Sequence, residues 1–333
     1  MAILRAMNKL SDFDASMGFR DITTAGYFDT TYGISSATSN TELAAATDAS
    51  YLEISGLAES LSEGVTLWIH FRLYGRGKGT SSSALPFLAI YDLAGSIPAA
   101  IVKPSGGSET FRLRVSGTTT VTSSMSLALA QNTLYTFDVS LTLSGGVLTF
   151  SVYLDGTLWD TRNTPYVHSA SKLPDKIRII PAGISYGVVN TCAISELIVA
   201  TQNTIGMHLA PLPPTANGDF AEWVGQVSYL TDAALDTGLQ ASAANARHSW
   251  TVPAYTAALS IVAVAANFRA YSPTESGTGL TPFLRLSSTN YDGVSVPLTA
   301  EKFIHPTWNT NPATGAAWAA GDIGGLQIGV KAS

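Results

Sequence analysis

Charged residues are scarce in this 333-residue sequence, since Asp, Glu, Lys and Arg together make up 13% of it. Soluble domains typically carry roughly 25%. Thr, Ser, Gly and Ala stand where charges would usually be found. A surface with so few charges resists self-association poorly, so we expect other subunits to cover much of the exterior and the chain to form a homo-oligomer. The alternative is a soluble monomer from a lineage that uses few charges.

Cysteine is almost absent, and the one residue of this type is Cys192. A single cysteine forms no intrachain disulfide, so the fold does not depend on oxidation and is compatible with assembly in a reducing cytoplasm. Because Cys192 lies inside an apolar strand pattern, we expect it to be a small buried hydrophobe.

Long hydrophobic runs are also missing. The first ten residues lack the apolar core of a signal peptide, and the longest apolar candidate, 257–266, is too short to span a membrane. The net charge of −6 argues against nucleic acid as a main partner. The one basic cluster comprises Arg72, Arg76 and Lys78. The sequence therefore predicts neither membrane insertion nor nucleic-acid binding.

Alternating side chains dominate the stretch 135–159. Apolar residues occupy every second position of 135–143 and again of 148–154, which is the period of strands with one buried face. Gly145-Gly146 and Asp155-Gly156 supply tight turns between these strands and a third one at 157–159. This antiparallel meander predicts an all-β protein built from β-sandwiches.

Further strand patterns follow along the chain, separated by Gly and Pro turns. We expect an N-terminal arm or edge strand at 1–49, a jelly-roll β-sandwich at 50–205 and a second β-sandwich domain at 206–333. The Pro-rich run 211–219 is predicted to be the linker. The other predicted strands are 51–54, 65–73, 86–91, 99–102, 110–115, 176–181 and 192–200 in the first domain, and 259–269, 282–286, 294–298, 302–305 and 326–330 in the second.

Two glycine-rich segments resemble catalytic or phosphate-binding motifs. The segment 183–187 matches G-x-S-x-G, but a nucleophile elbow needs a helix after the serine and the residues that follow favour a loop or strand. The segment 75–80 has Gly79, not Ser or Thr, after Lys78, and it lacks the first glycine of a phosphate loop. A hairpin turn and a solvated loop are the favoured interpretations.

Metal and glycosidase signatures are weak. No two of the five histidines have the i, i+2 or i+4 spacing of a metal pair, so a zinc or iron site requires convergence in space. Asp12 and Asp14 offer oxygens to calcium, but no full cage is evident. Sandwich glucanases use an E-x-D-x-E strand that is missing here. We therefore assign no catalytic residue, no cofactor and no metal ligand. The histidines are His70, His168, His208, His248 and His305.

Aromatic residues at predicted strand ends or turns leave two interpretations open. Exposed rings there stack on sugars, whereas buried rings pack in a core or an interface, which is the commoner case. The sequence does not decide which residues bind a ligand. The residues concerned are Trp159, Tyr166, Trp223, Trp250, Trp308 and Trp318.

The central meander is similar to the core hairpin of concanavalin A-like and laminin G-like jelly rolls, in which a strand, a Gly turn and a V-Y-x-D-G strand recur. Residues 152–156 carry that match, and the run 194–200 looks like the closing strand of the same fold. The resemblance covers roughly residues 50 to 205 and implies a concanavalin A-like jelly roll for the first domain.

The second half resembles a unit of structural proteins of tailed bacteriophages. The matching pieces are 218–223, the strands around Arg269 and Arg285, and the ending 311–330. The sequence departs from that pattern at Gly321, Gly324 and Gly325, so we expect a looser short turn before the last strand.

This resemblance implies a virion structural protein that is not an enzyme and that is assembled in the host cytoplasm with other virion proteins as partners. It leaves open whether the subunit decorates the capsid, is associated with the tail or belongs to a fibre. The alternative is an adhesin that binds a host-surface glycan through loop aromatics.

Overall fold

A computed structural model describes the following residues of the chain: 2–7, 14–15, 19–22, 33–36, 38–39, 51–76, 86–102, 110–123, 127–130, 133–180, 189–230, 238–256, 260–272, 278–299 and 301–333. The chain divides into two compact units, Met1–Leu209 and Ala210–Ser333. The sequence-based boundary at 205/206 lies a few residues before this division. Each unit is described below by itself.

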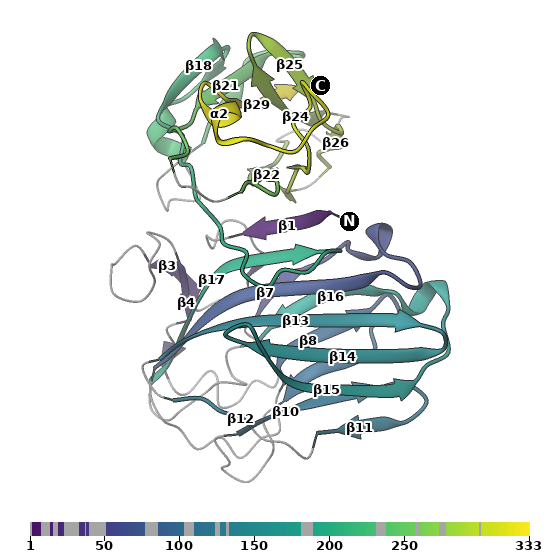
Figure 1. Ribbon diagram of the computed structural model, residues 1–333. Helices are drawn as coiled ribbons and strands as arrows, with labels where there is room; N and C mark the ends of the chain where they lie inside the picture. The colour runs from purple at the N-terminus through teal and green to yellow at the C-terminus, as the bar shows by residue number, and fades with distance from the viewer. Residues whose placement is uncertain are drawn as a thin grey trace. The chain divides into compact units, whose positions relative to one another are not determined.

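The first unit is a β-sandwich of two antiparallel sheets, as predicted (Figure 1). Among the described strands, one sheet runs in the order β15-β14-β13-β7-β17-β4-β3, with β1 and β5 also paired to β17. Its strands are β1 (Ile3–Met7), β3 (Phe19–Ile22), β4 (Gly33–Ser36), β5 (Thr38–Ser39), β7 (Thr66–Arg76), β13 (Leu134–Ser144), β14 (Val147–Leu154), β15 (Thr157–Pro165) and β17 (Val189–Ala200).

The second sheet runs in the order β11-β10-β9-β8-β16-β6-β2, with β12 paired to β10. Among the described residues of this unit, two single-turn 3-10 helices lie between strands, at Ala58–Ser60 and Ala170–Lys172. The strands of the sheet are β2 (Asp14–Ala15), β6 (Leu52–Ile54), β8 (Pro86–Asp92), β9 (Ala99–Val102), β10 (Thr110–Ser116), β11 (Thr120–Thr122), β12 (Leu127–Ala128) and β16 (Pro174–Ile179).

The alternation seen in the sequence places the core as predicted. On β13, Phe137, Val139, Leu141 and Leu143 are buried between the sheets. A cluster of aromatic rings lies at the centre, where Phe87 contacts Phe71, Phe111 and Phe137 at ring-centroid distances of 5.7, 6.0 and 6.0 Å. These rings come from both sheets, so they bind the two layers together.

The predicted turns of the meander are also present. Gly145 and Gly146 have φ angles of 57° and 74°, and Asp155 and Gly156 have φ angles of 49° and 77°. Both residues of a two-residue hairpin loop then have positive φ, which suits the twist of the flanking strands. The Asp155 carboxylate also accepts a hydrogen bond of 2.9 Å from the Thr136 backbone N–H, so the turn is tied to the neighbouring strand.

The outer edge of β15 is covered by the opposite sheet. The Thr118 backbone N–H donates to the Pro165 carbonyl at 2.9 Å, and the hydroxyls of Thr119 and Thr164 lie 3.0 Å apart. Further along the strand, Ser123 hydrogen-bonds to Asp160. Gly117 is required here, because a Cβ atom would lie 2.2 Å from the Pro165 oxygen. The hairpin of β10 and β11 therefore protects this edge from pairing with another chain.

The second unit is also β-structure. Among its described strands, the largest sheet runs β18-β21-β29-β24-β25, with β26 paired to β24, and three short strand pairs accompany it. Strands of these pairs contribute Phe268, Ile304, Val264 and Trp308 to the two apolar clusters on one face of the sheet. The strands are β18 (Ala216–Ala221), β19 (Trp223–Val224), β20 (Gln240–Ala241), β21 (Arg247–Thr251), β22 (Val264–Ala265), β23 (Phe268–Ala270), β24 (Gly279–Leu286), β25 (Thr289–Asp292), β26 (Val296–Pro297), β27 (Lys302–Ile304), β28 (Thr307–Trp308) and β29 (Gln327–Ala332).

Two local predictions for the second unit are wrong. The segment 216–219, predicted as linker, belongs to β18, because Ala216 and Asn217 pair with Thr251 and Trp250 of β21. The predicted strand 259–269 is represented in its described part by the short strands β22 and β23.

Helices are short throughout the described residues. In the second unit they are a 3-10 turn, Val227–Leu230, and α2 (Ala320–Ile323). The expected looser turn near Gly321 is thus a single helical turn, whose Asp322 carboxylate accepts a hydrogen bond from the Ala319 N–H. No helix in the described part of the chain has the length and apolar character needed to cross a membrane.

Candidate functional site

The most unusual side chains of the first unit lie on the outer face of the nine-stranded sheet. On β7, Leu67, Ile69, Phe71 and Leu73 face the core, so alternation directs His70 and Arg72 to the other face. Residues pointing away from a sandwich core usually meet solvent. Here His70 is 0% exposed and Arg72 is 8% exposed.

Asp138 lies directly opposite His70 on the neighbouring strand β13. Its Oδ1 atom is 2.9 Å from Nδ1 of His70, and it also accepts a hydrogen bond of 2.7 Å from the Thr204 hydroxyl. Thr204 belongs to the stretch that follows β17, so this stretch covers Asp138 and excludes water from it. Asp138 is 0% exposed as a result.

Glu196 enters the same site through a β-bulge. The register between β17 and β7 is regular up to the pair Ser195–Arg72 and resumes at the pair Ile198–His70. Glu196 has a φ angle of 54°, a left-handed conformation that non-glycine residues seldom adopt. The bulge therefore places the Glu196 carboxylate between Arg72 and His70, where regular pairing would not bring it.

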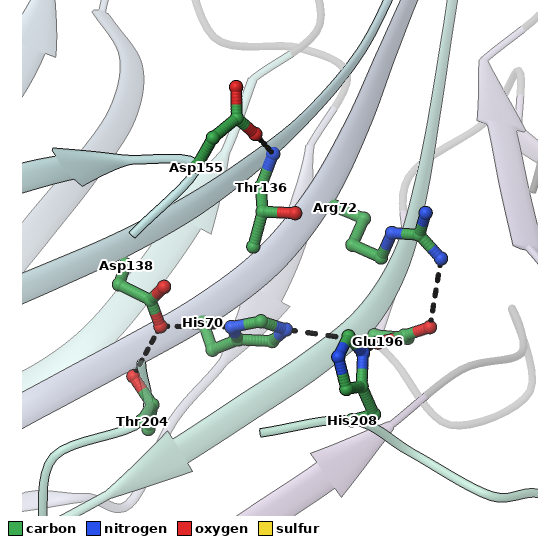
Figure 2. A network of polar contacts seen from close by, with 8 residues as sticks. All are labelled: His70, Arg72, Thr136, Asp138, Asp155, Glu196, Thr204 and His208. Atoms are coloured by element: carbon green, nitrogen blue, oxygen red, sulfur yellow. Dashed lines mark hydrogen bonds and ion pairs between the residues drawn. The ribbon is translucent and has the colours of Figure 1, made fainter. Parts of the chain in front are cut away.

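The Glu196 carboxylate is the centre of the arrangement (Figure 2). Its Oε1 lies 3.2 Å from Arg72 Nη1, and its Oε2 lies 2.9 Å from His208 Nδ1 and 3.8 Å from His70 Nε2. The Glu196 side chain is 1% exposed, whereas that of His208 is 51% exposed. We name the six residues His70, Arg72, Asp138, Glu196, Thr204 and His208 the polar network.

The surroundings shift the pKa values of two of these groups. Burial on its own would lower the pKa of His70, but the hydrogen bond to Asp138 and the charges of Asp138 and Glu196 outweigh it, so the pKa is raised. Burial would raise the pKa of Glu196, whereas His70, His208 and Arg72 stabilise the carboxylate and hold its pKa below the usual range. The surroundings thus favour the protonated form of His70 and the ionised form of Glu196.

The polar network holds the chain in place. Thr204 and His208 are bonded to carboxylates of β13 and β17, and Thr201 is bonded to Ala2, just before β1. The stretch 201–208 is therefore fixed on the sheet just before the first unit ends at Leu209. In the part of the chain that the structure describes, no group of three or more His, Cys, Asp or Glu side chains is arranged to hold a metal ion.

We expect the stability that His70 contributes to be lost at alkaline pH. A group whose pKa is raised on folding stabilises the protein fully below its unfolded value, about 6.5 for histidine. Stability then falls as the pH rises through the raised value. Urea unfolding of the His70→Gln variant between pH 5 and 10 should show a weaker alkaline decline than the parent protein.

Titratable groups remote from His70 cancel in that comparison, because they are present in both proteins, whereas Asp138 and Glu196 are coupled to His70 itself. His248 of the second unit has a pKa lowered by burial, so its contribution declines on the acid side, as the pH drops below about 6.5. Identical alkaline slopes for the two proteins would contradict a raised pKa for His70.

Several motifs considered in the sequence lie outside the described residues. The G-x-S-x-G segment 183–187 is one, and Lys78, Asp12 and most of the loop 75–80 are others. Asp14 begins β2 and Cys192 lies in β17. Arg72, expected in a basic cluster, is instead paired with Glu196.

The six candidate aromatic residues pack against apolar clusters. Tyr166, Trp250 and Trp318 are buried at 8%, 4% and 5% exposure. Trp159, Trp223 and Trp308 are partly buried against the cores of their units. Core packing is therefore the observed role of these rings, and they do not form an open stacking surface.

The histidines were expected to be scattered, but the fold brings His70 and His208 together, with ring centroids 6.3 Å apart. His168 is exposed, and His305 lies 2.9 Å from the Asn267 amide oxygen. The sequence held one signal for the polar network that we missed: His70, Asp138 and Glu196 each interrupt an apolar strand on neighbouring strands of one sheet.

No family model matches the chain, and no curated protein matches it either. Solved structures do resemble it. The binding domain of botulinum neurotoxin serotype G has a TM-score of 0.38 and 7% identity, and the match covers 60% of this chain and 44% of that one. The receptor-binding domain of the botulinum neurotoxin C/D mosaic serotype has a TM-score of 0.39 and 9% identity, over 76% of this chain and 71% of that one.

A family 7 alginate lyase in complex with its substrate is also similar, with a TM-score of 0.34 and 17% identity. The match covers 56% of this chain and 85% of the lyase. The prediction that the chain is not an enzyme is wrong in this respect, because an enzyme is among the proteins whose structures it resembles.

Proposed function

We propose that the chain is a structural subunit of a tailed-bacteriophage particle and acts through contacts with other virion proteins and with copies of itself. The resemblance of residues 218–223 and 311–330 to such proteins supports this proposal. The scarcity of charge, at 13% of residues, supports it as well, since subunit contacts favour surfaces with few charges.

The observation that carries the proposal is the polar network. A buried, mutually paired set of charges contributes little net stability compared with apolar residues, yet it fixes geometry and is costly to break. Here it fixes the stretch 201–208, which leads from the first unit into the second. A fixed end of the first unit suits a subunit that is held between neighbouring proteins in an assembly.

Mass spectrometry of particles purified from cultures of the source strain tests this function. We expect the chain at a constant ratio to the main shell or tail protein, and we expect antibodies against it to label intact particles at one kind of position. Absence from particles, with the chain found free or on the cell envelope, would overturn the proposal.

A surface-binding role is the second candidate. One observation favours it: basic side chains gather on the outer face of the eight-stranded sheet, in a chain whose net charge is −6. Binding of the intact chain to host cells, without incorporation into particles, would favour this candidate over the first.

A further inference from the structure

The outer face of the eight-stranded sheet carries most of its described charges as cations. On β10, Phe111, Leu113 and Val115 face the core, so Arg112 and Arg114 point outward. On β16, Ile177 and Ile179 face the core, so Lys176 and Arg178 point outward as well.

Cross-strand pairing aligns these residues in one row. Arg114 pairs with Ala100, and Ala100 pairs with Ala89. Ala89 in turn pairs with Arg178, whose partner on its other side is Glu53. Neighbouring strands are about 4.8 Å apart, so Arg114 and Arg178 stand about 14 Å apart across two alanines. Four cations and the carboxylate of Glu53 leave an excess of three positive charges on this face among the described side chains.

The cations on the two sides of the row differ in what they contact. The Nε atom of Arg178 lies 2.6 Å from Oε2 of Glu53. Its Cζ atom lies 4.1 Å from the ring centroid of Tyr51 and 4.8 Å from that of Tyr91. Within the described part of the chain, neither Arg112 nor Arg114 forms an ion pair with a carboxylate. The Nε atom of Arg112 is buried without a hydrogen-bond partner. Arginines without carboxylates in an acidic protein are available to an external anion.

The surroundings of these cations favour a hydrophilic ligand. None of the large exposed apolar side chains of the described residues lies on the strands of this sheet, whereas a protein partner would need an apolar centre to the interface. A nucleic acid would use open aromatic rings for stacking, but Tyr51 and Tyr91 are already stacked on Arg178. The hydroxyl of Thr122, opposite Arg114, adds a group suited to sugar hydroxyls.

We propose that this face binds an acidic polysaccharide, a sugar polymer bearing carboxylates at intervals, with Arg112 and Arg114 on one side of the alanines and Lys176 and Arg178 on the other. The separation of about 14 Å across three strand spacings suits an extended polyanion better than a single small anion. This inference does not rest on a place in a virus particle.

The test uses the intact chain and four probes: polygalacturonate, neutral dextran, single-stranded DNA and inorganic polyphosphate. We expect binding to polygalacturonate in isothermal titration calorimetry, none to dextran, and a decline as salt is raised from 50 to 300 mM, because salt screens exposed charges. The variant Arg112→Gln/Arg114→Gln should bind at least tenfold more weakly. Its folding is checked by circular dichroism, and no carboxylate loses a partner through these substitutions.

The matched control is Arg247→Gln/Arg285→Gln, which removes the same charge from the second unit, where both arginines are paired with aspartates. It should bind as the parent does. An equal loss of binding in both variants would show that net charge alone causes the effect, and it would overturn the assignment of the site. Failure to bind polygalacturonate, or tighter binding to DNA or polyphosphate through the same arginines, would overturn the ligand class. Particle incorporation of the Arg112→Gln/Arg114→Gln variant is a separate readout for the structural role.

Discussion

Glu196→Gln should lower the free energy of unfolding of the first unit by about 3 kcal/mol, because removing one partner of a buried ion pair leaves the other charges uncompensated. Glutamine keeps the shape of the side chain, and it tolerates the left-handed backbone conformation at this position as well as glutamate does. What it removes is the negative charge that Arg72 and His208 contact at 3.2 and 2.9 Å. Urea unfolding at pH 7 measures the effect.

Two further variants give this prediction its controls. Asp292→Asn removes a carboxylate from a more exposed pair with Arg247, so it should cost less than about 1 kcal/mol. Adding Arg72→Met to Glu196→Gln should recover part of the loss, since removing both partners leaves no unpaired charge between them. A loss for Glu196→Gln no larger than that for Asp292→Asn would show that the polar network does not hold the fold together.

Phe87→Ala should be at least as damaging, with a loss of about 3–5 kcal/mol, which is the range for deleting a buried phenylalanine. Phe87 is 0% exposed and contacts three other phenylalanines from both sheets. Removal of the ring leaves a cavity between the layers that backbone pairing prevents from collapsing. Thermal or urea unfolding of the variant measures the loss.

Phe87→Leu is the matched control, since it fills most of the space and should cost clearly less. Similar small losses of unfolding free energy for Phe87→Ala and Phe87→Leu would mean that the two sheets move together and fill the cavity. A further comparison is Phe220→Ala in the second unit, where a partly exposed ring contacts Phe283 at 6.0 Å. It should also cost less than Phe87→Ala.

The sequence predicted the first unit well where local pattern decides structure. Alternation over 135–154 located β13, β14 and the buried face of each, and the glycines marked the turns. These features depend on residues that are neighbours along the chain. The strand β18 was missed because all of its residues except Phe220 are small or polar and follow a Pro-rich run. Only pairing with β21 defines them as a strand.

The contacts within the polar network could not be predicted from the sequence for a different reason. Asp138 and His70 are 68 residues apart in sequence, and Thr204 is 66 residues from Asp138. Alternation correctly puts Asp138 on the face away from the core, but it carries no information about what covers that face. The bulge at Glu196 is equally invisible, because it is defined by the register of β17 against β7.

The covered edge of β15 limits how copies of this protein can associate. Thr118, Thr119 and Ser123 occupy the flank along which another backbone would add. Addition of another chain's strand to this edge is therefore blocked, so contacts between copies on this side must be made through side chains.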